Sequence, residues 1–292
     1  MNEYELVNNI KDNKVLFKSF NQLAQETFEI NFEDWAALGY WEDSYIPYAL
    51  MNQKEIIANA SITKGELVVR DKRYQVIQIG TVMTKKAYRS QGLSKILMER
   101  IIEKYQETSD IIYLFANETV LDFYPKFGFK RVNELSVVVP TNQLIPQNRK
   151  LKQCQFEIEK EKLENYGRNR NNHHLETYLV DNYSLTMFYF STVFAQNIYF
   201  IEDLDVFVTY EIEGEELHLF DILSQKAISV KEVLSYLPIE KITSIVCHFH
   251  LKEEIGLIMT QQEEPLDEDA LFFLGKGSVE CDSIKFPLFS HS

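Results

Sequence analysis

The sequence predicts an α/β (α+β) protein whose sheet is mixed and mostly antiparallel, with one parallel pair of strands at its centre. The parallel pair is predicted because two apolar, β-branched segments, Tyr74–Thr84 and Ile111–Phe115, flank an amphipathic helical pattern. A helix that joins two neighbouring strands makes them parallel, with a right-handed crossover. The antiparallel part is predicted because short strand patterns, separated by polar turns, precede Tyr74.

The segments before the central unit are expected to form helices and then hairpins. Residues 15–28 have apolar side chains near helical spacing, and Asn31 stands where it can cap a second, short helix that ends near Gly39. Strands are expected at residues 45–51, 56–63 and 66–69, with turns at residues 52–54 and at Lys64-Gly65.

The central helix has one apolar stripe that is expected to face the sheet. The stripe consists of Leu93, Ile96, Leu97, Ile101 and Tyr105. The strand after it, Ile111–Phe115, is apolar without interruption, which is typical of a strand buried on both faces. A last strand of this domain is expected at Leu135–Val139.

The length of 292 residues favours two domains. Residues 141–152 are polar and contain a proline, so we place the boundary there, between a domain of residues 1–140 and a second α/β domain of residues 153–292. The second half repeats the order strand, helix, strand at residues 217–223, 229–237 and 242–248. We interpret it as a degenerate copy of the first, without a phosphate cradle, because no glycine opens its helix.

The turn between the long strand and its helix is a candidate anion site, and it reads Arg89-Ser90-Gln91-Gly92-Leu93-Ser94. The first N–H groups of a helix have no partner inside the helix, and the helix dipole adds positive charge there, so phosphate groups bind at such ends. Gly92 lets a ligand approach the backbone, and Arg89 offers a planar, permanently charged donor group.

This turn resembles the pyrophosphate loop of the GNAT superfamily of acyl-CoA-dependent N-acetyltransferases. The family pattern is Arg or Gln, two residues, Gly, one residue, and then Gly or Ala; Arg89, Gly92 and Ser94 stand at these positions. A second similarity follows downstream, where Asn117 comes after a buried strand and Tyr124 stands in F-Y-P-K-F-G-F. Ser94 departs from the pattern, but serine is small and its hydroxyl can donate to a phosphate.

The resemblance implies acetyl-CoA as the cosubstrate and a set of residues that bind it. The two central strands would splay apart, so that the backbone of Val82, Met83 and Thr84 pairs with the pantetheine arm as another strand would. Asn117 would hydrogen-bond this arm, and a helix N-cap is the equally good alternative for it. The pyrophosphate would bind the loop and the first helical turn: Arg89, Ser90, Gln91, Gly92, Leu93, Ser94 and Lys95.

The resemblance also implies Tyr124 as the general acid. Transfer of an acetyl group to an amine expels the thiolate of coenzyme A, and a phenol can supply the proton that this sulfur needs. Packing is the alternative role for a tyrosine in so aromatic a chain. No general base is identified: Glu29, Glu33, Asp34 and Asp43 lie in segments that resemble the family's acceptor side, and water or a backbone carbonyl could serve instead.

The implied function is transfer of an acetyl group from acetyl-CoA to a primary amine of a small molecule, by direct attack. Two alternatives stay open: the acceptor is an amine of a protein or peptide, or the chain is a non-catalytic acyl-CoA-binding module. The C-terminal domain would cover one side of the acceptor cleft or form the contact of a homodimer.

Composition narrows the partners and the compartment. The net charge is −14, and residues 141–292 carry −12 of it, which argues against nucleic acid. This acidic half would steer a cationic amine or simply keep the chain soluble. No apolar run approaches the roughly 20 residues that span a bilayer, and the N-terminus is acidic and polar, so we expect no membrane contact and a cytoplasmic protein.

No metal is predicted from the cysteines or histidines. Cys154, Cys247 and Cys281 are widely spaced and odd in number, which indicates reduced thiols without a ligand pattern. His248 and His250 share one face of a predicted strand, but no third ligand is spaced nearby.

Overall fold

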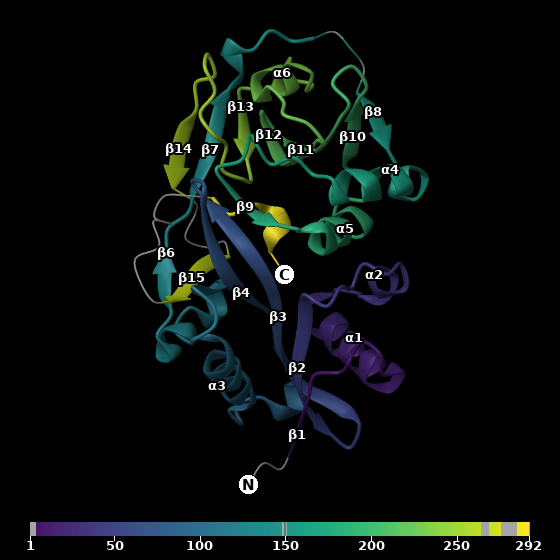
Figure 1. The fold of residues 1–292 in the computed structure, drawn as a ribbon, viewed down its shortest axis with the longest axis vertical. Helices are drawn as coiled ribbons and strands as arrows, with labels where there is room; N and C mark the ends of the chain where they lie inside the picture. The colour runs from purple at the N-terminus through teal and green to yellow at the C-terminus, as the bar shows by residue number, and fades with distance from the viewer. Residues whose placement is uncertain (1–3, 148, 150, 264–268, 276–284, 292) are drawn as a thin grey trace.

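The computed structural model describes residues 4–147, 149, 151–263, 269–275 and 285–291. Within these residues the chain forms two mixed sheets, one of eight strands and one of seven, with helices between and around them (Figure 1). Each sheet contains one parallel pair, and its other named pairings are antiparallel. The predicted fold class is therefore confirmed.

The first sheet has the strand order β1-β2-β3-β4-β5-β15-β6, and β9 also pairs with β3. Its hairpin turns at Gln53-Lys54 and Arg70-Asp71 have two residues with positive φ, which matches the twist of a tight hairpin. The turn expected at Lys64-Gly65 is wrong, because β3 continues through these residues, paired with β4. The strands are β1 (Glu5–Val7), β2 (Tyr45–Asn52), β3 (Glu55–Val69), β4 (Lys72–Thr84), β5 (Ile111–Ala116), β6 (Lys130–Val132), β9 (Thr177–Val180) and β15 (Ala270–Gly275).

Helices α1 (Lys14–Phe28), α2 (Glu33–Ala37) and α3 (Leu93–Tyr105) cover this sheet. α3 buries Leu93, Leu97 and Ile101 on one face, and α1 packs on the other. Ile96 was expected in the same stripe but is 39% exposed. Three residues turn a helix by about 300°, so Ile96 lies on the opposite side of Leu93 from Leu97 and Ile101.

The second sheet has the strand order β14-β7-β13-β12-β11-β10-β8. The strand, helix, strand unit predicted in this half is confirmed as β12, α6 and β13, with the two strands parallel. The strands are β7 (Leu135–Pro140), β8 (Lys152–Cys154), β10 (Ile198–Ile201), β11 (Val206–Glu213), β12 (Glu216–Leu223), β13 (Ser244–Cys247) and β14 (Thr260–Glu263). The helices are α4 (Phe156–Arg168), α5 (Tyr183–Ser191) and α6 (Val230–Ser235), and the short 3-10 helices of the chain are η1 (Lys86–Tyr88), η2 (Glu118–Val120), η3 (Tyr124–Phe127), η4 (Thr141–Gln143) and η5 (Leu288–Ser290).

Strands of each half take part in the sheet of the other half. β9, from the C-terminal half, pairs with β3 in the first sheet. β7, expected as the last strand of the N-terminal domain, lies in the second sheet between β13 and β14. β15, from the C-terminal half, lies in the first sheet between β5 and β6. Figure 1 shows the teal β7 in the upper sheet and the yellow β15 in the lower one. Each sheet is therefore completed by a strand from the other side of the predicted boundary.

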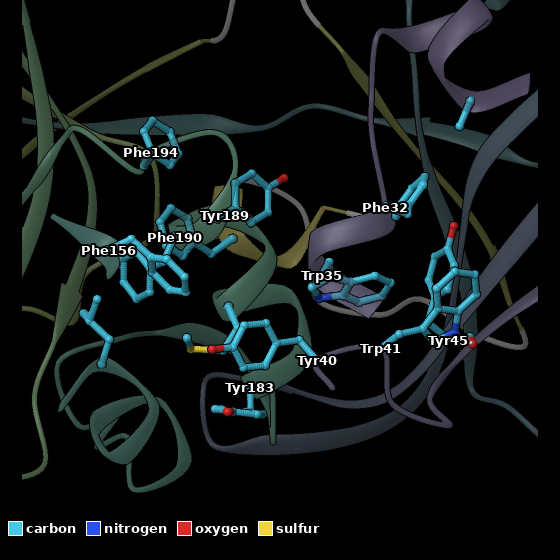
Figure 2. Packing of buried hydrophobic residues seen from close by; sticks show 14 of the residues in the cluster. Phe32, Trp35, Tyr40, Trp41, Tyr45, Phe156, Tyr183, Tyr189, Phe190 and Phe194 are labelled. Carbon is cyan, nitrogen blue, oxygen red and sulfur yellow. Dashed lines mark hydrogen bonds between the residues drawn. The ribbon is translucent and has the colours of Figure 1, made fainter. Parts of the chain in front are cut away.

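One aromatic core joins the two halves (Figure 2). Phe32 and Trp35, from the α2 region, contact Phe188 of α5, and the ring centroids are 5.8 Å apart in each pair. The indole Nε1 of Trp35 donates to the carbonyl of Ser184, 3.0 Å away, and the Ser184 hydroxyl donates to the carbonyl of Tyr40 at 2.7 Å. Because buried hydrogen bonds and rings cross between the halves, they pack as one unit.

Candidate functional site

The parallel strands β4 and β5 pair at one end and separate at the other. Their pairing runs from Val76 opposite Ile111 to Ile79 opposite Leu114, and β4 continues to Thr84 without β5 beside it. A cavity of about 480 Å³ opens where they separate. It is lined by Phe28, Ile30, Phe32, Trp35, Tyr45, Ile79, Gly80, Thr81, Val82, Ser94, Phe115, Ala116, Asn117, Val120, Phe123, Tyr124, Leu185, Phe188, Tyr189, Asp269 and His291.

A β-bulge in β4 lies at the mouth of this separation. The pairing with β3 shifts between Ser61, opposite Gly80, and Asn59, opposite Met83. Thr81 has φ of 50°, which is strained for a β-branched residue. The Asn59 side chain donates to the carbonyl of Thr81 at 2.9 Å, and the hydroxyls of Tyr45 and Thr81 lie 2.8 Å apart. These bonds hold the bulge, which turns the backbone of β4 toward the cavity.

The N-terminus of α3 lies next to the end of β4. Its N-cap is Gly92, with φ of 77°, and no side chain caps the helix. A Cβ on Gly92 would meet nothing within 4 Å, so glycine is favoured here by the left-handed backbone conformation and not by lack of space. The space in front of the helix end is open. Ser90 also has positive φ, at 62°. The loop therefore presents the first N–H groups of a 13-residue helix without a side-chain acceptor of their own.

The predicted loop residues lie at this helix end. The Arg89 Nε donates to the carbonyl of Thr84 at 3.2 Å, and the Ser94 hydroxyl lies 2.9 Å from that of Thr84. The structure thus brings the end of β4 and the start of α3 together. Gln91 accepts from the Tyr4 hydroxyl at 3.3 Å, and Lys95 lies 3.7 Å from Glu99 on the exposed side of the helix. Of the seven loop residues, Ser94 also lines the cavity.

Tyr124 lies on the wall of the cavity at the start of η3. Its side chain is buried against Phe123 and against Phe272 of the exchanged strand β15, with ring centroids 5.2 and 6.0 Å apart. Burial raises the pKa of Tyr124 to about 12. The phenol is therefore protonated at neutral pH and could donate a proton inside the cavity.

Asn117 lies where β5 ends and also lines the cavity. Its side-chain oxygen accepts from the N–H of Thr119 at 3.1 Å, so it caps η2. The capping role weighed for this residue is confirmed. Contact with a coenzyme arm stays a prediction.

Both halves of the chain line the cavity. Phe32 and Trp35 line it from the N-terminal half, and Leu185 and Phe188 of α5 from the C-terminal half. None of the four acidic residues considered as bases, Glu29, Glu33, Asp34 and Asp43, is among the lining residues.

Asp269 and His291 also line the cavity, and the sequence alone did not identify either. His291 is more than 160 residues from Tyr124 in the chain, and no motif surrounds it. Only the packing of the C-terminal segment on β5 and α5 brings it there.

The two histidines considered as metal ligands have different partners in the structure. His248 lies 3.0 Å from His218 between ring nitrogens, and the Nδ1 of His250 accepts from the N–H of Lys285 at 3.3 Å. Among the described residues, no three His, Cys, Asp or Glu side chains gather as metal ligands would. Cys154 and Cys247 are buried free thiols, whereas Cys281 lies outside the described residues.

In the part of the chain that the structure describes, no helix is long and apolar enough to span a membrane.

Comparison with protein families identifies the first half. Residues 13–132 match the family model described as an acetyltransferase (GNAT) domain. This match identifies residues 13–132 as a GNAT acetyltransferase domain. The match contains β4, α3, β5 and Tyr124, so the loop and one part of the cavity wall lie inside the GNAT domain. A GNAT domain makes acyl transfer the supported chemistry. No curated protein matches the sequence.

Solved structures resemble the chain over both halves. A probable N-acyltransferase from Enterococcus faecalis has a TM-score of 0.58 and 12% identity, over 93% of this chain and 72% of that one. A GCN5-related N-acetyltransferase from Anabaena variabilis has a TM-score of 0.57 and 14% identity, over 93% of this chain and 72% of that one. A GCN5-related N-acetyltransferase from Kribbella flavida has a TM-score of 0.55 and 14% identity, over 93% of this chain and 70% of that one. At such identities the likeness shows the fold, and it extends well beyond the matched GNAT domain.

Proposed function

We propose that the protein transfers an acetyl group from acetyl-CoA to a primary amine of a small molecule. One observation carries this proposal: the cavity between the separated strands β4 and β5 opens beside the uncapped N-terminus of α3. A thioester in the cavity and a pyrophosphate at the helix end would then belong to one extended ligand, which is the chemistry of acyl-CoA.

The coenzyme would bind along residues already close to one another. The pyrophosphate would accept hydrogen bonds from the backbone N–H groups that follow Gly92 and from Arg89 and Ser94. The pantetheine arm would pair with the free edge of β4 at residues 82–84. The thioester carbonyl would accept from N–H groups of the bulge at Thr81.

The reaction then needs no covalent enzyme intermediate. The amine nitrogen attacks the thioester carbonyl, the new C–N bond forms, and the C–S bond breaks. Tyr124 would give its phenolic proton to the departing sulfur, so that coenzyme A leaves as a thiol, and the proton that the amine nitrogen loses would restore the phenol by way of water. The cavity would also raise the reaction rate above that in solution because it holds the amine and the thioester close together in a reactive orientation.

The lining of the cavity supports a small acceptor with an apolar body. A volume of about 480 Å³ is typical of small-molecule sites, and aromatic rings form most of the acceptor side. Asp269 is the one acidic side chain among the described lining residues, whereas a polycation would need several. The acidic surface of the C-terminal half is therefore more consistent with solubility than with selection of a polyamine. A cytoplasmic location stays a prediction.

Isothermal titration with acetyl-CoA and with coenzyme A tests the first part of the proposal. We expect micromolar binding of both, with a single site. A thiol-release assay then compares phenethylamine and tryptamine with spermidine, lysine and a lysine-containing peptide. Faster turnover of the aromatic amines is expected. Binding without turnover of any amine would favour the non-catalytic module, and preference for the peptide would favour a protein acceptor.

A further inference from the structure

His291 presents an unexplained buried nitrogen at the cavity. Its Nε2 is buried and has no hydrogen-bond partner within the described residues. The ring lies on the ring of Phe115, at the end of β5, with centroids 3.5 Å apart and planes 21° apart. Both residues line the same cavity as Tyr124. A buried polar group without a partner requires an explanation, and a ligand that donates to it is one.

The segment that carries His291 is fixed rather than loosely attached. The Tyr189 hydroxyl donates to the carbonyl of His291 at 3.0 Å, and the Asn182 side chain donates to the carbonyl of Phe289 at 2.7 Å. The N–H of Leu288 donates to the carbonyl of His248 at 2.9 Å. The ring therefore has a defined place, as a catalytic group needs.

The surroundings of His291 keep its imidazole neutral. Burial lowers its pKa well below 6.5, and the positive charges of Lys285 and His248 act in the same direction. Among the described lining residues, Asp269 is the acidic group that shares the cavity with it, and Tyr45, Tyr124 and Tyr189 are the phenols. A neutral imidazole has one ring nitrogen that accepts a hydrogen bond, so His291 is unprotonated and can accept a hydrogen bond from an N–H group throughout the physiological pH range.

We infer that His291 is the proton acceptor for the attacking amine, a role for which the sequence offered no residue. This inference rests on the proposed function. As the amine nitrogen forms its bond to the acetyl carbon, its excess proton passes to Nε2 of His291. The C–S bond breaks, and the sulfur takes the proton of Tyr124. The products are the N-acetylated amine and coenzyme A thiol, and one proton returns from His291 to Tyr124 through water.

Removal and chemical rescue of the imidazole test this role in the full chain. In His291→Ala and in His291→Gln, we expect kcat/KM to fall about 100-fold, as for loss of a general base, while acetyl-CoA binding changes less than about twofold. Added imidazole should raise the rate of His291→Ala by about tenfold or more, and the rate should saturate as the imidazole concentration increases. His173→Ala is the matched control, because His173 is an exposed histidine outside the lining residues, and its rate should stay that of the wild type.

The outcomes separate this role from a structural one and from the proposed function. Wild-type activity in His291→Gln, which keeps the shape but cannot take the proton, would overturn the assignment. The assignment would also be overturned if imidazole raised the rate of His291→Ala by no more than it raises the rate of the wild type. In both of these cases the wild type still turns over, so the proposed function stands. A wild type without turnover overturns both.

Discussion

The two strand, helix, strand units of the molecule have the same topology but different helix ends. In the first, Gly92 caps α3 and no side chain accepts from its first N–H groups. In the second, the Ser229 hydroxyl accepts from the N–H of Glu232 at 3.1 Å, and Glu254 accepts from the N–H of Val230 at 2.7 Å. A carboxylate of the protein thus binds where a phosphate would bind in the first unit.

The gaps beyond the paired strands differ in the same way. β4 and β5 separate around a cavity, whereas the end of β12 in the second unit is filled. There the ring of Phe220 stacks on His248 and on Phe194, with centroids 4.6 and 4.5 Å apart, and η5 packs alongside. The order of strands is therefore the same in the two units, and what distinguishes the first is an open helix end beside an open gap.

Closing the open helix end should have the largest effect. Gly92→Glu would place a carboxylate where the pyrophosphate is proposed to bind, and we expect acetyl-CoA binding to weaken about 1,000-fold by titration calorimetry. Gly214→Glu is the matched control. Gly214 also has positive φ, at 60°, and a Cβ there would also meet nothing within 4 Å, but it lies in the second sheet's hairpin. Equal losses in the two variants would show that backbone strain, not the site, is responsible.

Removing the phenol at the cavity should have the next largest effect, on turnover alone. In Tyr124→Phe we expect kcat to fall about 100-fold, with acetyl-CoA binding unchanged, because the leaving sulfur loses its proton donor. Since the pKa of Tyr124 is about 12, the phenol keeps its proton up to about pH 10, so its ionisation should cause no loss of wild-type rate below that pH. Tyr113→Phe, another buried phenol of the first half, is the control. An unchanged kcat in Tyr124→Phe leaves packing as the role of this ring.

Removing one charge beside the helix should have a smaller effect. In Arg89→Ala we expect acetyl-CoA binding to weaken about tenfold, and the loss should shrink at high salt, because a surface charge on a phosphate is screened. Arg100→Ala removes an arginine from the exposed face of the same helix, where it pairs with Glu103 at 3.0 Å. A tenfold loss of acetyl-CoA affinity in Arg100→Ala as well would indicate that the overall positive charge on α3 attracts the coenzyme, and that Arg89 makes no specific contact.

The features predicted from the sequence are the local ones. The loop from Arg89 to Ser94 and the stripe of α3 depend on neighbours within a few residues, and the sequence carries that information. The exchange of β7 and β15 could not be predicted, because the choice of a pairing partner is decided between segments more than 100 residues apart. His291 was missed for the same reason. The bulge at Thr81 runs against the preference of a β-branched residue and is held by Asn59 and Tyr45 instead.

Opening the second helix end should affect stability but not coenzyme binding. In Glu254→Ala, the N–H of Val230 loses its acceptor, and we expect the free energy of unfolding in urea to fall by about 1–2 kcal/mol. Glu253→Ala, which removes the exposed neighbouring carboxylate, should change it little. Calorimetry on Glu254→Ala should still give one acetyl-CoA per chain, because the gap beside β12 remains filled by Phe220 and η5. A second bound coenzyme would mean that an open helix end is sufficient for binding, and that the filled gap does not prevent it.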